Sequence, residues 1–191
     1  MLLVVGLGNP GREHARNRHN AGWLVVDELA RRHGGSWKSK FSGQMAEVRV
    51  GEARLALLKP ETYMNDSGRS VGPAAAFFKL EPEDVLVVHD EGDFDLGRLE
   101  LKVGGGLAGH NGLRSIKQHL HSDAFVRVRI GVGKPPSKER GADHVLSRVS
   151  KREREAMDVT IEEAADALEC IATDGAQAAM NRYNGRSPDA E

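Results

Sequence analysis

His19 is the first residue whose type and place could serve hydrolytic chemistry. It lies between Arg18 and Asn20, at the predicted start of a helix. The positive end of the helix dipole disfavours an imidazolium there, and a general base needs a neutral imidazole at neutral pH. A single histidine is more often structural or solvated than catalytic, so this position alone leaves both interpretations open.

A second histidine, His89, is followed directly by Asp90 and Glu91 at the exit of an apolar run, residues 85–88, that predicts a buried strand. A carboxylate in this place could accept the second N–H of an imidazole and orient the ring, as an aspartate does in hydrolytic triads. The alternative is an acidic turn, because residues 81–95 hold seven acids and no Lys or Arg.

Three asparagines occur in segments between predicted elements: Asn9 after the first strand, Asn65 in residues 59–68, and Asn111 in residues 104–112. A side-chain amide offers a donor and an acceptor together, so it can pair with a peptide unit of a substrate. Five glycines in residues 104–112 indicate a loop whose backbone amides could bind an anion or a carbonyl. The structural alternatives are that Asn65 shapes a turn and that Asn111 caps a helix.

Residues 6–11 formally satisfy the dinucleotide fingerprint G-x-G-x-x-G, which would indicate an oxidoreductase. The fingerprint needs a helix that opens within the glycines, whereas the helical pattern here begins only after His19. The acids at the expected offset, Asp27 and Glu28, fall inside that helix. A tight strand-exit loop that presents Asn9 at the carboxyl end of a strand fits the pattern better.

Metal and cysteine chemistry find little support in the spacing. A metal site would have to pool His19, His89, Asp90 and His110, which form neither H-x-x-x-H nor H-E-x-x-H. The one cysteine, Cys170, excludes an internal disulfide and a Cys-rich zinc site. We therefore expect no metal and no cofactor. Without a signal sequence or a membrane-length apolar stretch, we expect a soluble, cytoplasmic protein with no membrane contact.

These residues need a scaffold, and hydrophobic periodicity predicts a single α/β domain with a twisted mixed β-sheet, surrounding helices and a long C-terminal helix. We assign residues 1–184 of the 191 to one catalytic domain and residues 185–191 to a disordered tail. No heptad or exposed apolar stripe is evident, so we expect a monomer. The predicted strands cover residues 2–5, 45–50, 53–58, 85–88, 98–103 and 125–132, and the predicted helices 20–33, 67–79, 111–120 and 151–173, the last ended by Gly175.

The charges are balanced overall but unevenly distributed. Lys and Arg total 27 against 28 Asp and Glu, so the net charge is −1, which excludes a uniformly basic coat for nucleic acid. Residues 98–134 nevertheless hold seven Lys and Arg against two acids. Two of these, Arg127 and Arg129, are predicted to point outward from a strand. The segment is either ordinary solvated surface or a patch that binds phosphates.

Six motifs occur in order along the chain: VGLGNPG, RHNAGW, KPETYMNDSG, VVHDEGDFDLGRLELK, GGGLAGHNGLRSI and FVRVRIGVGKP. From about Leu2 to Asn181 the chain closely resembles bacterial peptidyl-tRNA hydrolases. The resemblance implies a cytoplasmic enzyme of translation and ribosome rescue that hydrolyses the ester bond of peptidyl-tRNA at the acceptor end and releases peptide and free tRNA. The alternative on the same fold is a catalytically silent RNA-binding module.

The resemblance also implies roles for individual residues. The catalytic residues would be His19 as the base, Asp90 as its orienting carboxylate, and Asn9; the substrate-binding residues would be Tyr63, Met64, Asn65, His110 and Asn111; the tRNA-binding residues would be Lys102 and Arg129. Because no serine or cysteine stands in a nucleophile motif, we expect water, activated by His19, to attack the ester directly. Glu100 stands where some members carry a second lysine, which leaves the strength of the phosphate contacts open.

Overall fold

The fold is taken from a computed structural model, which describes residues 1–8, 20–107, 109–133 and 151–185. The helices and strands are β1 (Leu2–Gly6), α1 (Ala21–His33), β2 (Lys38–Lys40), β3 (Gly43–Val50), β4 (Ala53–Pro60), the 3-10 helix η3 (Met64–Asp66), α2 (Gly68–Phe77), the 3-10 helix η4 (Pro82–Asp84), β5 (Val85–Glu91), β6 (Leu99–Val103), α3 (Asn111–Leu120), β7 (Val126–Gly131), α5 (Lys151–Asp174) and α6 (Ala176–Tyr183).

The seven strands form one mixed sheet in the order β2-β3-β4-β1-β5-β7-β6. The four inner strands β4, β1, β5 and β7 run parallel, and the outer pairs β2–β3, β3–β4 and β6–β7 are antiparallel. This confirms the expected mixed sheet. It also means that the inner strands all end at one edge, the carboxyl edge, where ligands bind in open α/β sheets.

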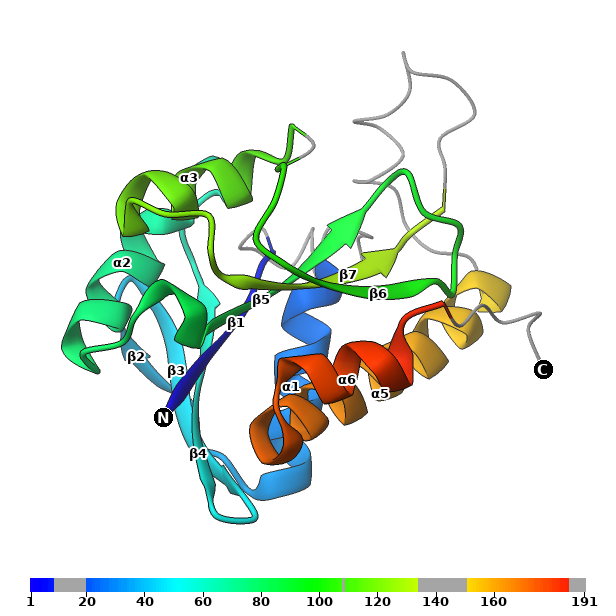
Figure 1. Cartoon of the computed structure of the whole chain (residues 1–191), viewed down its shortest axis with the longest axis horizontal. Coiled ribbons are helices and arrows are strands. Elements are labelled where there is room, and N and C mark those ends of the chain that lie inside the picture. The colour runs from blue at the N-terminus through cyan, green and yellow to red at the C-terminus, as the bar shows by residue number, and fades with distance from the viewer. Residues whose placement is uncertain (9–19, 108, 134–150, 186–191) are drawn as a thin grey trace.

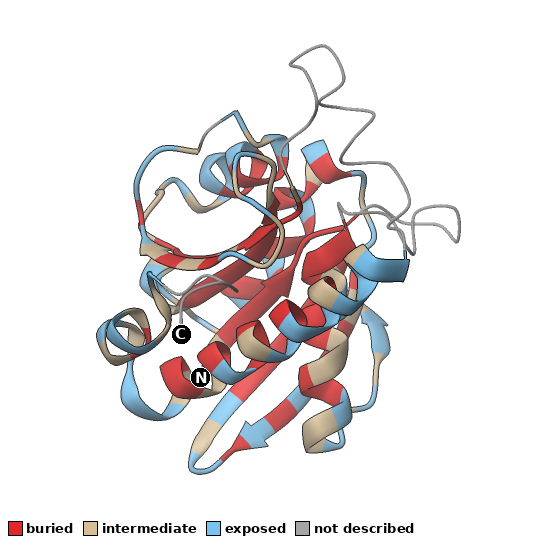
Figure 2. Cartoon of the chain, turned by 90° about the vertical axis from the view of Figure 1, so that its right-hand side faces the viewer, coloured by how far each residue is buried: buried red, intermediate tan, exposed pale blue. Residues whose placement is uncertain are grey.

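Helices cover both faces of the sheet, with α1 and α5 on one side and α2 and α3 on the other (Figure 1). Alternate residues of β1 serve the two sides: Val4 belongs to the core under α1 and α5, whereas Leu3 and Val5 belong to the core under α2 and α3. The central strands are buried along almost their whole length, and the helices expose only their outer faces (Figure 2). Successive residues of the strands thus contribute to two cores, one on each face of the sheet, and both cores support the carboxyl edge.

The predicted strands and helices are confirmed to within a few residues at their ends, and the structure adds elements that the sequence analysis did not predict. β5 continues through Glu91 because its pairing with β7 runs to the register pair Glu91–Gly131, so His89 and Asp90 lie in the strand rather than in an acidic turn. Gly175 ends α5 as expected, but with φ 93° it also starts a further helix, α6, which the sequence analysis missed. The short strand β2 was also missed, because three polar residues carry no hydrophobic pattern.

The predicted tail, residues 185–191, lies outside the described residues except for Gly185. In the described ranges, no helix has both the length and the apolar character needed to cross a membrane.

Candidate active site at the carboxyl edge of the sheet

The site is centred on the end of β5. Asp90 lies there, 5% exposed, with β1 on one side and β7 on the other. Its carboxylate Oδ1 lies 3.2 Å from Nε2 of His110, which comes from the start of α3. The structure therefore brings together a carboxylate and an imidazole that are 20 residues apart in the chain.

The ring of His110 has a defined tautomer in this arrangement. The backbone N–H of Leu113 donates to Nδ1 over 3.3 Å, so Nδ1 is the unprotonated nitrogen and Nε2–H faces Asp90. His110 is consequently the N-cap of α3. This contradicts the structural alternative in which Asn111 caps the helix: Asn111 is already helical, and the extended residue with φ −72° and ψ 115° is His110. The Asn111 side chain is exposed and does no capping.

Gly112 shows how closely the surrounding segments meet. A Cβ atom at this position would lie 2.7 Å from Sδ of Met64, 2.9 Å from Cδ1 of Leu7 and 3.0 Å from Cε1 of His110. The segments η3, the β1 exit and the α3 N-terminus therefore meet closely here, and a side chain at position 112 would require these three side chains to shift. The sequence-predicted residues Met64 and His110 are thereby brought side by side, and each is directly followed by an asparagine, Asn65 or Asn111.

Tyr63 extends away from this contact. Its side chain is 73% exposed and lines a pocket of about 610 Å³ together with Lys40, Thr62 and Arg69, among others. Met64, in contrast, is 7% exposed. The substrate-binding set predicted from the sequence thus divides into a buried part against α3 and an exposed rim.

His19 and Asn9 lie outside the described residues, but the residues next to that segment are described. A Cβ at Gly8 would lie 2.7 Å from Oδ1 of Asn20, and a Cβ at Gly22 would lie 2.5 Å from both the Leu7 nitrogen and the Val88 oxygen. The first turn of α1 is therefore packed tightly against the exits of β1 and β5. Asn20, directly after His19 in the chain, is buried at this contact.

Arg127 contradicts the expectation that both arginines of β7 point outward. It is 1% exposed, because the glycine-rich segment after β6 passes over it and accepts a hydrogen bond from its Nη1 at the Gly106 carbonyl. Its Nε donates to Nε2 of His89 over 3.3 Å. Alternation in a strand predicts which residues share a face, but it does not show which loops cover that face.

His89 is fully buried beside Asp90, and both of its ring nitrogens form hydrogen bonds. Because the Arg127 Nε–H is a donor, Nε2 of His89 must accept, and Nδ1–H then donates to the Asp90 carbonyl over 2.8 Å. Burial, followed by the nearby His110, holds the pKa of His89 well below its usual value. His89 has no free nitrogen with which to act as a base, so it is not the catalytic histidine of this site.

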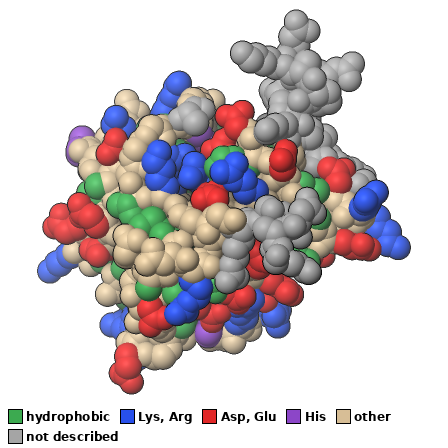
Figure 3. Space-filling model, turned by 45° about the vertical axis from the view of Figure 1, so that its right-hand side comes forward, with side chains coloured by type: hydrophobic (Ala, Val, Ile, Leu, Met, Phe, Trp, Pro, Cys, Tyr) green, Lys and Arg blue, Asp and Glu red, His purple; other side chains and the backbone are tan. Residues whose placement is uncertain are grey.

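The predicted tRNA-binding residues, Lys102 on β6 and Arg129 on β7, lie at the same side of the sheet and are partly exposed. The guanidinium of Arg129 lies 4.9 Å from the ring centre of Phe94, which also carries Arg98 at 4.0 Å. The sequence analysis did not single out Phe94. Lys and Arg side chains gather on one face of the molecule (Figure 3).

Glu100, the departure from the family pattern, is the register partner of Arg129 across β6 and β7. Its Oε1 lies 3.7 Å from Nε of Arg98 and accepts a hydrogen bond of 3.1 Å from the Gly185 nitrogen. The carboxylate is thus held toward Arg98 and the end of α6.

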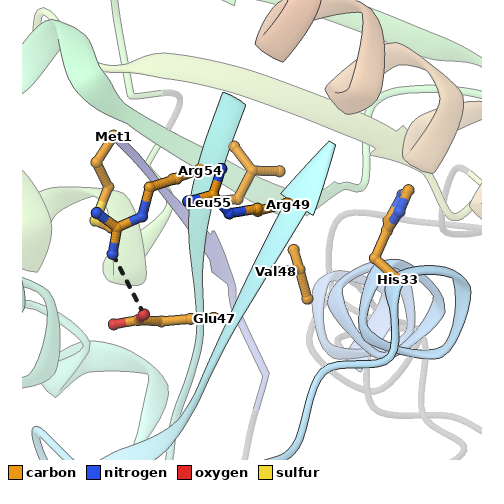
Figure 4. Close-up of a pocket in the computed structure, with 7 residues that line it drawn as sticks. All are labelled: Met1, His33, Glu47, Val48, Arg49, Arg54 and Leu55. Atoms are coloured by element: carbon orange, nitrogen blue, oxygen red, sulfur yellow. Dashed lines mark ion pairs between the residues drawn. The ribbon is translucent and has the colours of Figure 1, made fainter. Parts of the chain in front are cut away.

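A second end of the sheet offers a different pocket, of about 400 Å³ (Figure 4). It lies where β1 begins, and its lining residues are Met1, His33, Glu47, Val48, Arg49, Arg54 and Leu55. No residue predicted from the sequence as functional lies there. Within the described ranges, no group of three or more His, Cys, Asp or Glu side chains could hold a metal ion, and Cys170 is buried in α5.

Comparison with known proteins gives one consistent match. The family described as "Peptidyl-tRNA hydrolase" matches residues 3–191. The chain is 48% identical over 192 residues to a peptidyl-tRNA hydrolase of Anaeromyxobacter sp. (strain K), with 100% of each chain covered. It is 48% identical over 182 residues to that of Mycolicibacterium vanbaalenii, with 94% of this chain and 95% of the relative covered.

Solved structures agree with the sequence relatives. The crystal structure of peptidyl-tRNA hydrolase from Acinetobacter baumannii superposes with a TM-score of 0.93 at 42% identity, covering 98% of this chain and 96% of the other. A purine nucleoside phosphorylase from Toxoplasma gondii superposes with a TM-score of 0.56 at 7% identity over 92% of each chain, which shows a shared fold alone.

Proposed function

The chain belongs to the peptidyl-tRNA hydrolase family and is a peptidyl-tRNA hydrolase, and from this premise we propose that it hydrolyses its substrate at the carboxyl edge of the sheet, with His19 as the general base and Asp90 as the carboxylate that orients it. The observation that carries the proposal is the burial of Asp90 at the end of β5, where the start of α1 packs against the same strand at Val88.

Two contacts support a short distance between His19 and Asp90. Asn20, the neighbour of His19, is buried against Gly8, and Gly22 touches the backbone oxygen of Val88, two residues before Asp90. A carboxylate that is 5% exposed and accepts a hydrogen bond can hold an imidazole in one tautomer, with the basic nitrogen directed away. His89 is excluded as the base by its two hydrogen bonds, which strengthens the assignment to His19.

The chemistry follows from the ester that links the peptide carboxyl to the ribose of the terminal adenosine. His19 removes a proton from water as the water oxygen bonds to the ester carbonyl carbon. The carbonyl oxygen becomes an oxyanion, which the side-chain amides of Asn9, Asn65 or Asn111 can stabilise by hydrogen bonds. Collapse of this intermediate breaks the bond to the ribose oxygen, which takes a proton, and releases peptide and free tRNA.

Substrate binding is divided between the two sides of the site. We assign the peptidyl group to Tyr63, Met64, Asn65, His110 and Asn111, since Met64 and His110 meet at Gly112 and both asparagines follow them. We assign the phosphates of the acceptor end to Lys102 and Arg129 on the β6–β7 side. The chain would act as a monomer, and in the cytoplasm, where translation produces peptidyl-tRNA.

The test is hydrolysis of an N-blocked aminoacyl-tRNA by the wild type and by His19→Ala. General-base assistance contributes roughly 10²–10⁴-fold, so the variant should lose turnover by that factor while remaining folded. The matched control is His33→Ala. His33 is the last residue of α1, at the opposite end of the helix from His19, and its Nε2 lies 2.8 Å from a carboxylate oxygen of Glu169. Turnover by His19→Ala at the level of the control would contradict the assignment.

A further inference from the structure

Arg127 is unusual for an arginine on a sheet. It is among the largest fully buried side chains, and no acidic side chain in the described ranges pairs with its guanidinium. Burial and the neighbouring Arg129 lower the pKa of Arg127, and the charge of Glu91 opposes them only in part, so the protein bears an electrostatic cost to keep a cation here. Buried arginines are rare unless their donors are used, which makes its hydrogen-bond partners informative.

Those partners belong to two parts of the active site. Nη1 donates to the Gly106 carbonyl in the glycine-rich segment Gly104–Leu107, and Nε donates to His89 on β5. His89 is in turn hydrogen-bonded to the neighbouring residue, since its Nδ1–H donates to the backbone carbonyl of Asp90. The fork of one guanidinium therefore links the glycine-rich segment to the backbone of the residue that orients the base.

The Gly104–Leu107 segment is fixed at its two ends, where Gly104 is buried and Leu107 packs against the core under α2 and α3. Gly104 and Gly105 adopt positive φ values of 66° and 93°, and a Cβ at Gly106 would meet nothing within 4 Å. Its ends are tied by Gly104 N–H to the Phe125 carbonyl over 3.1 Å and by His110 N–H to the Leu107 carbonyl over 2.9 Å. Between these ends, Gly105 lies beside the Lys102 side chain, and the Gly106 carbonyl accepts the hydrogen bond from Nη1 of Arg127. Glycine backbone has the most conformational freedom to lose, so this hydrogen bond restrains a segment that is otherwise free to change conformation.

His110 connects the glycine-rich segment to both His89 and Asp90. It follows this segment, its ring packs edge-on against the ring of His89 at 4.9 Å, and its Nε2–H meets the carboxylate of Asp90. Displacement of Gly106 would move His110 and, with it, the adjoining Asn111. A shift of about 1 Å in a positioned group can lower a rate by about 10²-fold.

We propose that Arg127 and His89 are positioning residues for the hydrolase reaction, which hold the Gly104–Leu107 segment, and through it His110 and Asn111, in a fixed place relative to Asp90. Neither residue touches the substrate in this account. The inference rests on the proposed active site and goes beyond it, because it assigns a positioning role to two buried residues that are neither catalytic nor substrate-binding residues.

The first test is Arg127→Met, which replaces the guanidinium by a shorter, unbranched apolar side chain and removes both donors. We expect kcat on an N-blocked aminoacyl-tRNA to fall about 10- to 100-fold at a temperature at which the variant is folded. The control is Arg32→Met. Arg32 is also partly buried and also joins elements, through Glu28, Asp166 and Glu169, but it lies between α1 and α5. That variant should lower the unfolding temperature and leave kcat unchanged.

The second test separates the two hydrogen bonds of His89. His89→Gln places an amide oxygen near the position of Nε2 and can still accept from Arg127, whereas His89→Asn places an amide near Nδ1 and can serve only the Asp90 carbonyl. The proposal predicts that the glutamine variant retains at least severalfold more kcat than the asparagine variant. If Arg127→Met fails to fold, this comparison decides the question by itself.

Histidine side-chain NMR supplies a readout that a merely structural role would not move. The wild type should show His89 as the Nδ1–H tautomer, and Arg127→Met should lose that signature and broaden the Nε2–H signal of His110. Wild-type kcat in folded Arg127→Met, or asparagine equal to glutamine at position 89, would overturn the proposal. An active His19→Ala would overturn the proposed active site instead, so the two failures are distinguishable.

Discussion

The two ends of the sheet carry the same residue types and use them differently. At the amino end, Glu47 and Arg54 form an ion pair of 3.6 Å with side chains 45% and 55% exposed, in a pocket that Arg49 and His33 also line (Figure 4). At the carboxyl edge, Asp90 meets His110 at 3.2 Å with side chains 5% and 11% exposed. One pair is separated from water and the other is solvated, although the residue chemistry is similar.

The difference lies in what surrounds each charge. Exposed ion pairs contribute little, because water competes for them and salt screens them. A buried carboxylate with fixed partners keeps one orientation, which is what an orienting group in hydrolysis requires. Residue type therefore does not identify the site here, and neither does the pocket at the amino end. Burial, tautomer and hydrogen-bond direction distinguish the proposed site.

The largest expected effect comes from the carboxylate itself. Asp90→Asn preserves shape but replaces one acceptor oxygen by an N–H donor, so His19 would lose its orienting acceptor. We expect kcat to fall roughly 10²–10⁴-fold, with a much smaller change in KM. Steady-state kinetics on an N-blocked aminoacyl-tRNA measures both. A change confined to KM would show that Asp90 binds substrate rather than orients the base.

A second prediction concerns stability at the carboxyl edge. The pKa of His89 is lowered by burial, so below its ordinary value of 6.5 the unfolded chain binds a proton that the folded chain does not. The free energy of unfolding should therefore fall as the pH drops below about 6.5, by up to about 1.4 kcal/mol per pH unit from this residue. Denaturant unfolding at several pH values should show a shallower fall for His89→Gln, and parallel curves for the two proteins would refute the account.

A smaller effect, on KM and its salt dependence, is expected from removing a single cation, and it should differ between the two ends of the sheet. Lys102→Ala should raise KM severalfold and make its logarithmic dependence on salt shallower by about 0.7, as expected for one lost contact to a single-strand phosphate. Arg49→Ala removes an exposed cation from the amino end and should change neither quantity. Equal effects of the two variants would mean that the tRNA responds to overall charge and not to a defined patch.

The smallest effect is expected at the exposed pair. Glu47→Gln should change the free energy of unfolding by no more than about 0.5 kcal/mol and leave kcat unchanged. Thermal unfolding and the same hydrolysis assay measure the two. A substantial loss of turnover would mean that the amino end takes part in the reaction.

The sequence was sufficient for most of the fold because strand and helix periods are local. The structure contains the strand predicted at 85–88, the two strands predicted at 45–50 and 53–58, and the helix predicted at 111–120. Each of these segments has a hydrophobic pattern that can be recognised from its own residues. The polar strand β2 and the helix α6 were not predictable in this way, since three polar residues have no period and a single glycine can both end and start a helix.

The motifs predicted which residues belong to the proposed site, but not how those residues contact one another. Asp90 and His110 were named, yet their direct contact and the cap formed by His110 depend on chain segments far apart in sequence. Arg127 was wrongly expected at the surface, because the residues that cover it belong to another segment, at Gly106. The side-chain roles of the asparagines, of Lys102 and of Arg129 stay predictions.

The most direct measurement compares kcat for Asp90→Asn and Glu47→Gln, one carboxylate from each end of the sheet, in a single hydrolysis assay with an N-blocked aminoacyl-tRNA and folded protein. The account predicts a kcat at least about 10²-fold lower for Asp90→Asn than for Glu47→Gln, with the latter equal to the wild type. Equal kcat values for the two variants would contradict the assignment of the reaction to the carboxyl edge.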